Sequence, residues 1–414
     1  MAQERPTVAL IGTLDTKGAE YHWMTERLAG HGVDVVMVDA GTHPPQGFPG
    51  PAEFPGDAVA AAAGADLADL VAANDRGVAV TAMGDGAAAI TARLHAEGRL
   101  DGVLALGGSG GSSIAARAVR DLPVGLPKLL VSTMASGDVS PYVGASDVTL
   151  MYSVVDIAGI NQISRAVLGN AAAAIAGMAA AFHARAAAPA ADGDRPLIGA
   201  SMFGVTTPAV DAARERLEEL GYEVLVFHAT GSGGRALEAL ARSGMLAGVL
   251  DLTTTELADE LVGGVLTAGP DRLTAAGAAG VPQVVSLGAL DMVNFGPEAT
   301  VPERFAGRQL FVHNATVTLM RTTAAENAEL GRLLGAKLAG RPRTVLVVPR
   351  GGVSALDAEG MPFRDEAADA ALFEAVLAAA VGIPVIDSPA NINDPEFARR
   401  AADELHALIE GDAR

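Results

Sequence analysis

Residues 101–119 read DGVLALGGSGGSSIAARAV, a short apolar run followed by seven glycines and serines and then by a helix-forming segment. We predict a strand at Gly102–Leu106 and a helix that begins near Ile114, joined by the loop Gly107–Ser113. A strand that passes through a short loop into a helix is the unit from which parallel sheets are built. The stretch therefore predicts an α/β fold.

The same alternation of strand-like and helix-like segments runs through both halves of the chain, which has 414 residues. Between the halves, ARAAAPAADGDRP combines small residues, prolines and aspartates without an apolar period, which is typical of a linker. We predict an α/β domain over residues 1–185, a linker over 186–196 and a second α/β domain over 197–414. The length suffices for two hydrophobic cores.

Strands are predicted where a short apolar run is bounded by turn residues. In the first domain they are Thr7–Gly12, Val33–Asp39, Val78–Met83, Gly102–Leu106, Lys128–Thr133 and Val148–Val154. In the second they are Pro196–Met202, Glu223–His228, Gly248–Thr253, Gln283–Leu287, Gln309–Asn314, Thr344–Pro349 and Pro384–Asp387. The main predicted helices are Ile160–His183, Pro208–Leu220 and Thr323–Lys337.

The two halves repeat one another in outline. The segment that starts at Ile11 can be laid over the one that starts at Ile198, with strand, loop, helix, glycine turn and strand in the same order. DGVLAL at 101–106 matches AGVLDL at 247–252 in the same way. An internal duplication is the economical explanation, although any two Rossmann-like halves share this rhythm. We therefore expect two Rossmann-like domains with mainly parallel sheets.

Composition excludes several classes of function. The chain carries 49 acidic and 29 basic residues, a net charge of −20, and has no lysine or arginine run. Duplex binding needs a basic surface, so we expect no nucleic-acid partner. The absence of cysteine excludes disulfides, zinc ribbons and thiol catalysis and fits a reducing, cytoplasmic location.

Neither end of the first domain suggests a membrane. The start, MAQERPTVALIG, lacks a cationic segment followed by an apolar one, so we expect no signal peptide. The weakly polar stretch Ile157–Phe182 is interrupted by residues that a lipid-facing helix tolerates poorly. These are Asn161, Gln162, Ser164, Arg165 and Asn170.

The loop Gly107–Ser113 is the first candidate for ligand binding. In an open parallel sheet, ligands bind beyond the carboxyl ends of the strands, where helices begin. Glycine permits close backbone approach, so consecutive N–H groups can hold a phosphate or a carboxylate. A serine-capped turn would need fewer such residues. The predicted cradle comprises Gly107, Gly108, Ser109, Gly110, Gly111, Ser112 and Ser113.

The same loop fits the pattern G-x-S-x-G, which marks the nucleophile of α/β-hydrolases between a strand and a helix. Such an enzyme needs an acid and a histidine later in the chain. Within the first domain only His183 follows, on an alanine-rich helix. A hydrolase that uses Ser109 remains an alternative.

Two further loops of the first domain carry polar side chains at strand ends. In the opening loop, Thr13 offers a hydroxyl, Lys17 could neutralise a phosphate and Asp15 could hold Mg²⁺. The loop is not a Walker A motif, because the Gly-Lys-Ser/Thr ending is absent, and a surface capping loop is the alternative. A neighbouring loop offers Thr133, Ser136 and, as a second metal candidate, Asp138.

The second domain offers a separate set of polar residues. GSGG recurs at Gly231–Gly234, after His228 and before a helix that carries Glu238. His313 ends another strand and could act as acid or base, although a strand-end histidine is more often structural. Arg321 could pair with a phosphate or a carboxylate. An enzyme that holds a small anionic metabolite among these residues, in a cleft between the domains, is a second alternative.

Several long motifs run nearly from end to end of the chain. They are GTLDTKGAE (12–20), ALGGSGGSS (105–113), STMASGDVSPYVGASDVTLMYSVVDIAGIN (132–161), FHATGSGGRALE (227–238), SLGALDMVNFGP (286–297), HNATVTLMRTTAAEN (313–327) and VVPRGGVSALDAEGMPF (347–363). In these motifs the chain resembles the largely uncharacterised family that contains the ATP-binding inhibitory domain of the tomato mosaic virus resistance protein.

The resemblance implies two Rossmann-like domains, binding of ATP with Mg²⁺, and self-association as a homodimer or a higher homo-oligomer. The family's motifs fall on Thr13, Asp15 and Lys17, on Gly107–Ser113, and on His313, Asn314 and Arg321. We expect a soluble, Mg²⁺-dependent ATP-binding protein with the phosphates on Gly107–Ser113 and with Lys17 or Ser136 nearby. The plant protein's antiviral role is not implied.

Overall fold

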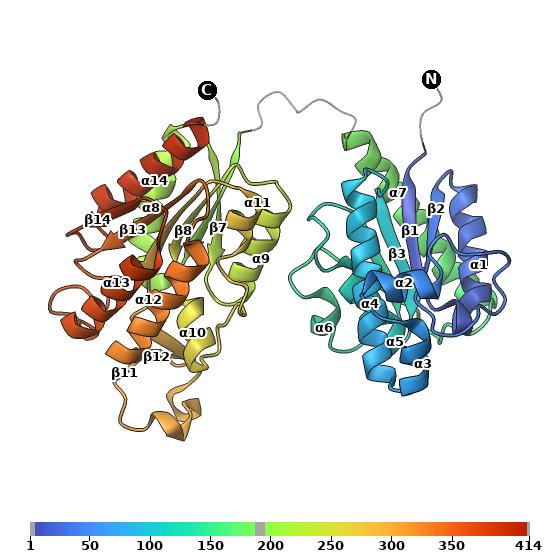
Figure 1. The fold of residues 1–414 in the computed structure, drawn as a ribbon, viewed down its shortest axis with the longest axis horizontal. Coiled ribbons are helices and arrows are strands. Elements are labelled where there is room, and N and C mark those ends of the chain that lie inside the picture. Colours follow the sequence, from blue (N-terminus) through green and yellow to red (C-terminus); the bar gives the residue numbers. More distant parts are fainter. Residues whose placement is uncertain (1–4, 187–194, 412–414) are drawn as a thin grey trace. The chain divides into compact units, whose positions relative to one another are not determined.

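The computed structural model describes residues 5–186 and 195–411. The chain forms two compact units, Met1–Ala191 and Asp192–Arg414, referred to below as the first and second unit (Figure 1). The linker predicted over 186–196 lies almost wholly outside the described residues.

The first unit contains a five-stranded parallel sheet in the order β2-β1-β3-β4-β5. This order is that of flavodoxin-like proteins, and the chain direction across the sheet reverses between β1 and β3. Ligands of such sheets bind beyond the carboxyl ends of the strands at that reversal. The strands are β1 (Thr7–Gly12), β2 (Asp34–Asp39), β3 (Gly102–Gly107), β4 (Lys128–Ser132) and β5 (Thr149–Tyr152).

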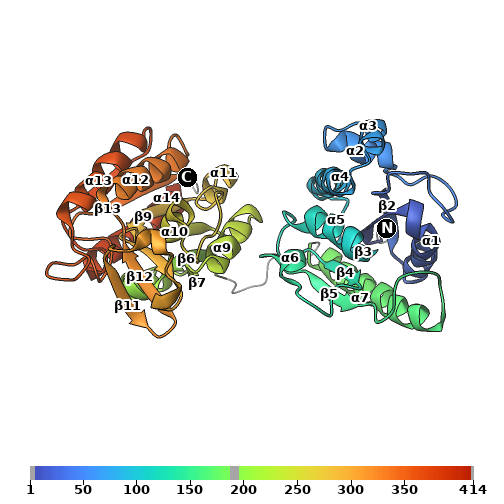
Figure 2. The ribbon, with the colours of Figure 1, turned by 90° about the horizontal axis from the view of Figure 1, so that it is seen from below.

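Helices cover both faces of this sheet, because the side chains of each strand alternate between the faces (Figure 2). Val8 and Leu10 of β1 pack in one core with α1 (Leu14–Gly30) and α7 (Gln162–Ala186). Ala9 and Ile11 pack in the other core with α4 (Arg76–Ala96) and α5 (Ser109–Val119). Three shorter helices complete the unit: α2 (Gly56–Ala62), α3 (Leu67–Ala73) and α6 (Ser140–Val143).

The strand predicted at Val78–Met83 is wrong, since this segment lies inside α4. Its valines suggested a strand, but Asp75 caps a helix there by accepting hydrogen bonds from the amides of Gly77 and Val78. The helix also needs a glycine for close packing. A Cβ atom on Gly86 would lie 1.9 Å from the carbonyl oxygen of Val59.

Within the described residues, α7 is the one helix long and apolar enough to cross a membrane. In the structure it contributes Leu168, Ala171 and Ile175 to the same core as α1. A core helix of a water-soluble protein meets the same criteria of length and apolarity, so this is weak evidence for a membrane span.

The second unit repeats the strand order of the first and adds one strand, giving β7-β6-β8-β9-β13-β14, all parallel. Val8 of β1 pairs with Gly102, and Ile198 of β6 pairs with Gly248. Ile198 therefore corresponds to Val8. The predicted superposition, which lays Ile198 over Ile11, is shifted by three residues. The strands are β6 (Leu197–Met202), β7 (Glu223–His228), β8 (Gly248–Thr253), β9 (Gln283–Gly288), β13 (Thr344–Pro349) and β14 (Val385–Ser388).

Helices also cover both faces of the second sheet. One face packs on α8 and α14, and the other packs on α9 to α13. The helices are α8 (Thr207–Glu219), α9 (Ser232–Arg242), α10 (Glu256–Val262), α11 (Ala275–Ala279), α12 (Ala324–Leu338), α13 (Glu366–Ala379) and α14 (Pro395–Glu410), with short 3-10 turns at Gly204–Thr206, Glu298–Thr300 and Glu303–Phe305.

A small antiparallel sheet in the order β10-β12-β11 accompanies the parallel one in the second unit. The strand predicted at Gln309–Asn314 is present as β11 (Leu310–Asn314), but it belongs to this small sheet. Its partners β10 (Met292–Phe295) and β12 (Val317–Arg321) were not predicted.

Candidate functional site

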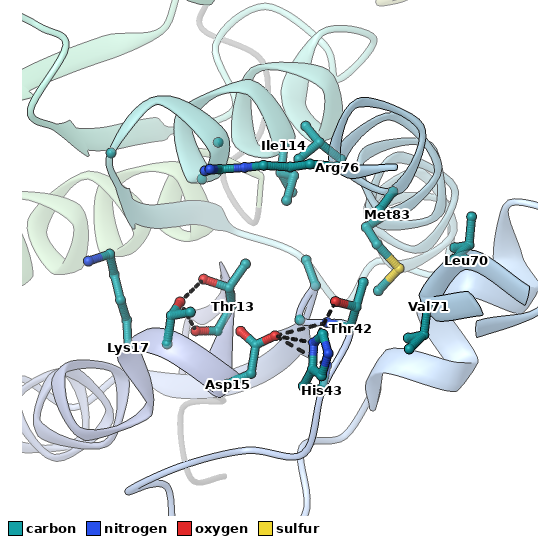
Figure 3. Close-up of a pocket in the computed structure, with 18 of the residues that line it drawn as sticks. Thr13, Asp15, Lys17, Thr42, His43, Leu70, Val71, Arg76, Met83 and Ile114 are labelled. Carbon is teal, nitrogen blue, oxygen red and sulfur yellow. Dashed lines mark hydrogen bonds and ion pairs between the residues drawn. The ribbon is translucent and has the colours of Figure 1, made fainter. Parts of the chain in front are cut away.

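A cavity of about 570 Å³ opens at the carboxyl ends of β1, β2 and β3 in the first unit. This is the place where the strand order reverses, so the fold positions the cavity as other doubly wound sheets position their ligand sites. Its walls come from the loops after these three strands and from α3 and α4 (Figure 3).

The start of α5 presents unpaired backbone donors to this cavity. Ser109, Gly110 and Gly111 are the first three residues of the helix, so their amides have no acceptor within it. The residue before the helix is Gly108, which has no side chain to cap them. Gly107 makes the turn possible, because a Cβ atom there would lie 2.8 Å from the Cα of Gly111. The resulting cradle suits an anion.

Arg76, which is not among the predicted site residues, places its guanidinium beside this cradle. A Cβ atom on Gly110 would lie 3.3 Å from Arg76 Nη2. The side chain lines the cavity, and it forms no ion pair or hydrogen bond with any residue that the structure describes. Because the predicted strand at Val78–Met83 placed Arg76 in a loop before a strand, nothing in the sequence directed attention to it.

Asp15 contributes a carboxylate to the opposite side of the cavity. Its Oδ2 atom accepts hydrogen bonds from the amides of Thr42 (3.1 Å) and His43 (3.2 Å). Its Oδ1 atom is buried and has no hydrogen-bond partner among the described residues. Nearby Asp39 accepts from the amide of Gly41, and burial raises the pKa of Asp39 despite that hydrogen bond. Asp15 therefore has one acceptor left for a ligand or a cation.

Lys17 also lines the cavity, at a kink in the first turn of α1 where its backbone leaves the helical conformation. Its ammonium donates a hydrogen bond to the carbonyl oxygen of Ile157, in the loop after β5. An ammonium has three donors, so this contact leaves donors for another acceptor.

The two ends of the cavity differ in character. Lys17 rises on one side and the guanidinium of Arg76 points toward the same end, whereas Leu70, Val71 and Met83 lie at the other end (Figure 3). The cavity thus joins a cationic end, rich in backbone donors, to an apolar end.

The structure brings together seven of the predicted binding residues in the cavity lining. These are Thr13, Asp15, Lys17, Gly108, Ser109, Gly110 and Gly111. Thr133 and Ser136 are not part of the lining. The Ser112 hydroxyl is buried against Ser132 Oγ at 2.6 Å, and Ser113 Oγ bonds back to its own helix at the carbonyl of Ser109.

Asp138, the second predicted metal ligand, also lies outside the lining. Its carboxylate accepts hydrogen bonds from the amide and the hydroxyl of Ser140, which lower its pKa. No group of three or more metal-ligating side chains occurs in the part of the chain that the structure describes. Any divalent cation here would depend on Asp15 and on the ligand itself.

Ser109 has no histidine partner in the described residues. It is exposed and forms the first residue of α5. The predicted partner His183 instead approaches Asp101 at 3.1 Å, and Asp101 lies at the amino end of β3, whereas Ser109 follows its carboxyl end. The base required by a serine hydrolase is therefore missing from this arrangement.

Glu238 of the second unit belongs to a buried structural network. It accepts hydrogen bonds from the amides of Leu273 (2.6 Å) and Ala275 (2.7 Å) at the start of α11. It also pairs with Arg272, which is fully buried and bonds to Asp251 at 2.7 Å as well. These contacts occupy the Glu238 carboxylate.

The second GSGG loop is also occupied, by a side chain of the protein itself. Glu256 Oε1 accepts hydrogen bonds from the amides of Gly231 (2.6 Å) and Gly234 (3.1 Å). The other oxygen of Glu256 binds Arg272 at 2.6 Å. A carboxylate thus fills the cradle at the start of α9.

Arg321 lies in a second buried network. Its guanidinium donates to the carbonyl of Phe363 and to Asp369 Oδ1, each at 2.7 Å, and lies 3.8 Å from Asp357. His228 and His313 are exposed. No hydrogen bond or ion pair joins these two histidines to Glu238 or Arg321 within the described ranges.

These observations define a protein of two Rossmann-like α/β units with a cavity at the strand-order reversal of the first. The models of an uncharacterised protein family, UPF0261, match both units: the N-terminal domain over residues 6–184 and the C-terminal domain over residues 195–409. The chain belongs to this family, as the resemblance indicated.

Relatives at high identity agree with this assignment. A UPF0261 protein of Clostridium tetani is 50% identical over 411 residues, covering 97% of this chain and 99% of the relative. The ToMV resistance protein Tm-1(GCR237) of Solanum lycopersicum is 45% identical over 337 residues, covering 80% of this chain and 45% of the tomato protein. The chain therefore matches less than half of that longer protein.

The fold also matches solved structures of low sequence identity. A putative UDP-N-acetylglucosamine 2-epimerase from Listeria monocytogenes has 11% identity and a TM-score of 0.22, with 100% of this chain and 98% of that chain covered. At this score the likeness carries no argument about the ligand.

Proposed function

We propose that the first unit binds a nucleotide, ATP with Mg²⁺, in the cavity at the carboxyl ends of β1 to β3. The observation that carries the proposal is the polarity of this cavity. At one end lie backbone amides and an arginine that have no partner among the described residues, and at the other end lie apolar side chains. A nucleotide has the same polarity, with phosphates at one end and a base at the other. The volume of about 570 Å³ lies within the range of small-molecule sites.

The phosphates would lie at the start of α5. Three amides without helical acceptors point into one cradle, and the positive end of the helix dipole favours an anion there. Arg76 can add two parallel hydrogen bonds to phosphate oxygens, and Lys17 can add a point charge. In a chain with net charge −20, these local cations are what make an anionic ligand possible.

Mg²⁺ would accompany the phosphates beside Asp15. This ion is usually held by one or two carboxylates together with phosphate oxygens and water. The unpartnered, buried Oδ1 atom of Asp15 fits this role, because an orphaned buried acceptor is costly unless something binds it. The ion would neutralise phosphate charge that the cradle and the two cations leave.

The base would lie against the apolar end. Met83 is buried, Leu70 is half-buried and Val71 is 40% exposed, so these side chains present carbon surface to the cavity. Covering such surface with a flat ring removes it from water, which favours binding.

The test is titration calorimetry with ATP and Mg²⁺ on the full chain. Arg76→Ala should weaken binding about tenfold to a hundredfold, the usual effect of losing hydrogen bonds to a charged group. Arg93→Ala is the matched control, since Arg93 lies in the last turn of the same helix over the ring of Phe54. Unchanged ATP affinity in Arg76→Ala would overturn the placement.

A pair of glycine variants tests the cradle in the same way. Gly110→Val places its side chain against the guanidinium of Arg76, so it should weaken binding. Gly177→Val is the control, because Gly177 is exposed on α7 with open space around its Cβ position, so this variant should bind ATP as the parent does. Equal affinities for the two variants would argue against phosphates at this turn.

A further inference from the structure

The loop between β5 and α7 is tied to the wall of the cavity by two charged side chains of α1. Lys17, which lines the cavity, donates to the carbonyl oxygen of Ile157. Glu20, only 5% exposed, accepts a hydrogen bond from the amide of Gly159. Lys17 and Glu20 are three residues apart near the start of α1, and both reach this loop. The position of this loop, residues 153–161, therefore depends on a helical turn that faces the ligand site.

The same loop contains a strained residue. Val154 has a φ of +66°, a backbone conformation that a β-branched residue rarely adopts. The turn is held by contacts between its neighbours, since Ser153 Oγ and the Val155 amide each form a 2.7 Å hydrogen bond across it. Strain of this kind persists only where the surrounding contacts impose it. The loop is therefore held both by these local bonds and by the two ties to α1.

The loop also holds apolar side chains in solvent. Val154 is 57% exposed and Val155 is 36% exposed, and Tyr152 at the end of β5 is 44% exposed. Ile157, in contrast, is 2% exposed and packs in the core. The exposed part of the loop is thus anchored through Ile157, whose carbonyl is the atom that Lys17 holds.

We propose that residues 153–161 form a ligand-responsive loop, in which phosphate bound in the cavity draws the Lys17 ammonium away from the Ile157 carbonyl and loosens the loop. The inference rests on the proposed function. A phosphate oxygen is a stronger acceptor for an ammonium than a carbonyl oxygen, because both partners are charged. The long, flexible stem of lysine allows the ammonium to move without a change in α1.

Glu20 sets the limit of this movement. Its carboxylate holds the amide of Gly159 on the other side of Ile157. Because it does not line the cavity, a ligand leaves this contact in place. The segment before Ile157, which includes the strained Val154 and its exposed neighbours, is therefore the part that changes. Ligand binding would alter the apolar surface that the unit presents at this edge of the sheet.

Hydrogen exchange followed by mass spectrometry tests the proposal on the full chain, with and without saturating ATP and Mg²⁺. Peptides from 150–160 should exchange severalfold faster with the nucleotide, while peptides from β11 and β12 of the second unit should not change. Lys17→Met should exchange fast in this loop without nucleotide and show no further response. Glu20→Gln should loosen the loop but keep the response, because Lys17 remains.

Calorimetric titration in the same buffer separates this inference from the proposed function. If ATP binds the parent chain and exchange in the loop is unchanged or slower, the loop mechanism is overturned while nucleotide binding stands. If ATP does not bind, both fall. A response in Lys17→Met equal to that of the parent would also overturn the role of Lys17, whatever the affinity.

Discussion

Replacing Asp357 with asparagine should remove a pH dependence from the stability of the second unit. Asp357 is fully buried in the Arg321 network, and its Oδ1 atom has no hydrogen-bond partner within the described residues. Arg321 and Arg364 lie 3.8 Å away. Burial, followed by the neighbouring charges of Asp291 and Asp369, raises the pKa of Asp357 to about 8. The folded protein therefore carries a proton on this carboxyl at neutral pH.

The sign and size of the effect follow from proton linkage. In the unfolded chain Asp357 is ionised above its ordinary pKa of 3.8, so folding takes up a proton between about pH 4 and pH 8. The stability that the Asp357 proton contributes is fully present below that range. This contribution is lost as pH rises through the range, by about 1.4 kcal/mol per pH unit. Asparagine has the same shape and no proton to take up. The stability of Asp357→Asn relative to the parent should therefore rise by about 3 kcal/mol from pH 5 to pH 7.

Calorimetric unfolding of the full chain between pH 5 and pH 7 measures the difference in free energy of unfolding between Asp357→Asn and the parent. The difference is taken from the thermal transition whose midpoint the substitution changes. Glu366→Gln is the matched control, because the Glu366 side chain is 87% exposed and its carboxylate also lies near Arg364. A constant difference between Asp357→Asn and the parent across this range would refute the argument, as would the same slope in the control.

Two further substitutions test the packing of each unit. Glu256→Ala leaves Arg272 Nε and two loop amides without an acceptor, while Arg272 keeps its bonds to Asp251. It should therefore cost the second unit about 3 kcal/mol in urea unfolding, and a loss below about 1 kcal/mol would contradict the buried network. Gly86→Ala should destabilise the first unit by about 1–3 kcal/mol, because its Cβ meets the Val59 carbonyl oxygen. Gly177→Ala is the control: its Cβ has open space around it, so the substitution should be neutral or stabilising by up to about 1 kcal/mol.

The parallel sheets could be predicted because their strands are short apolar runs that end in turns. Gly102–Leu106 and Lys128–Thr133 were placed within one residue of the observed β3 and β4. Val78–Met83 has the same valine-rich composition but lies in a helix. The deciding residues there are Asp75, which caps the helix, and Gly86, which permits close packing. Asp75 acts through its carboxylate and Gly86 through its lack of a Cβ atom, and a pattern of apolar residues contains neither.

The cavity was predictable in part. A glycine-rich loop after a buried strand indicates a cradle of amides, and Lys17 and Asp15 follow a strand end in the same way. Arg76 could not be found, because it comes from a helix that reaches the cradle only in three dimensions. Glu238 and Arg321 looked available in the sequence, yet each is committed to buried ion pairs.

The two GSGG loops show why composition alone does not identify a site. Both begin a helix and both offer backbone amides to an anion. In the second unit the anion is Glu256, which lies more than twenty residues later and reaches back to Gly231 and Gly234. In the first unit, no described side chain caps the amides at the start of α5, and an unpaired Arg76 lies beside them. The physical difference is whether the protein supplies the negative charge itself, and only the loop that lacks it is left to bind a ligand.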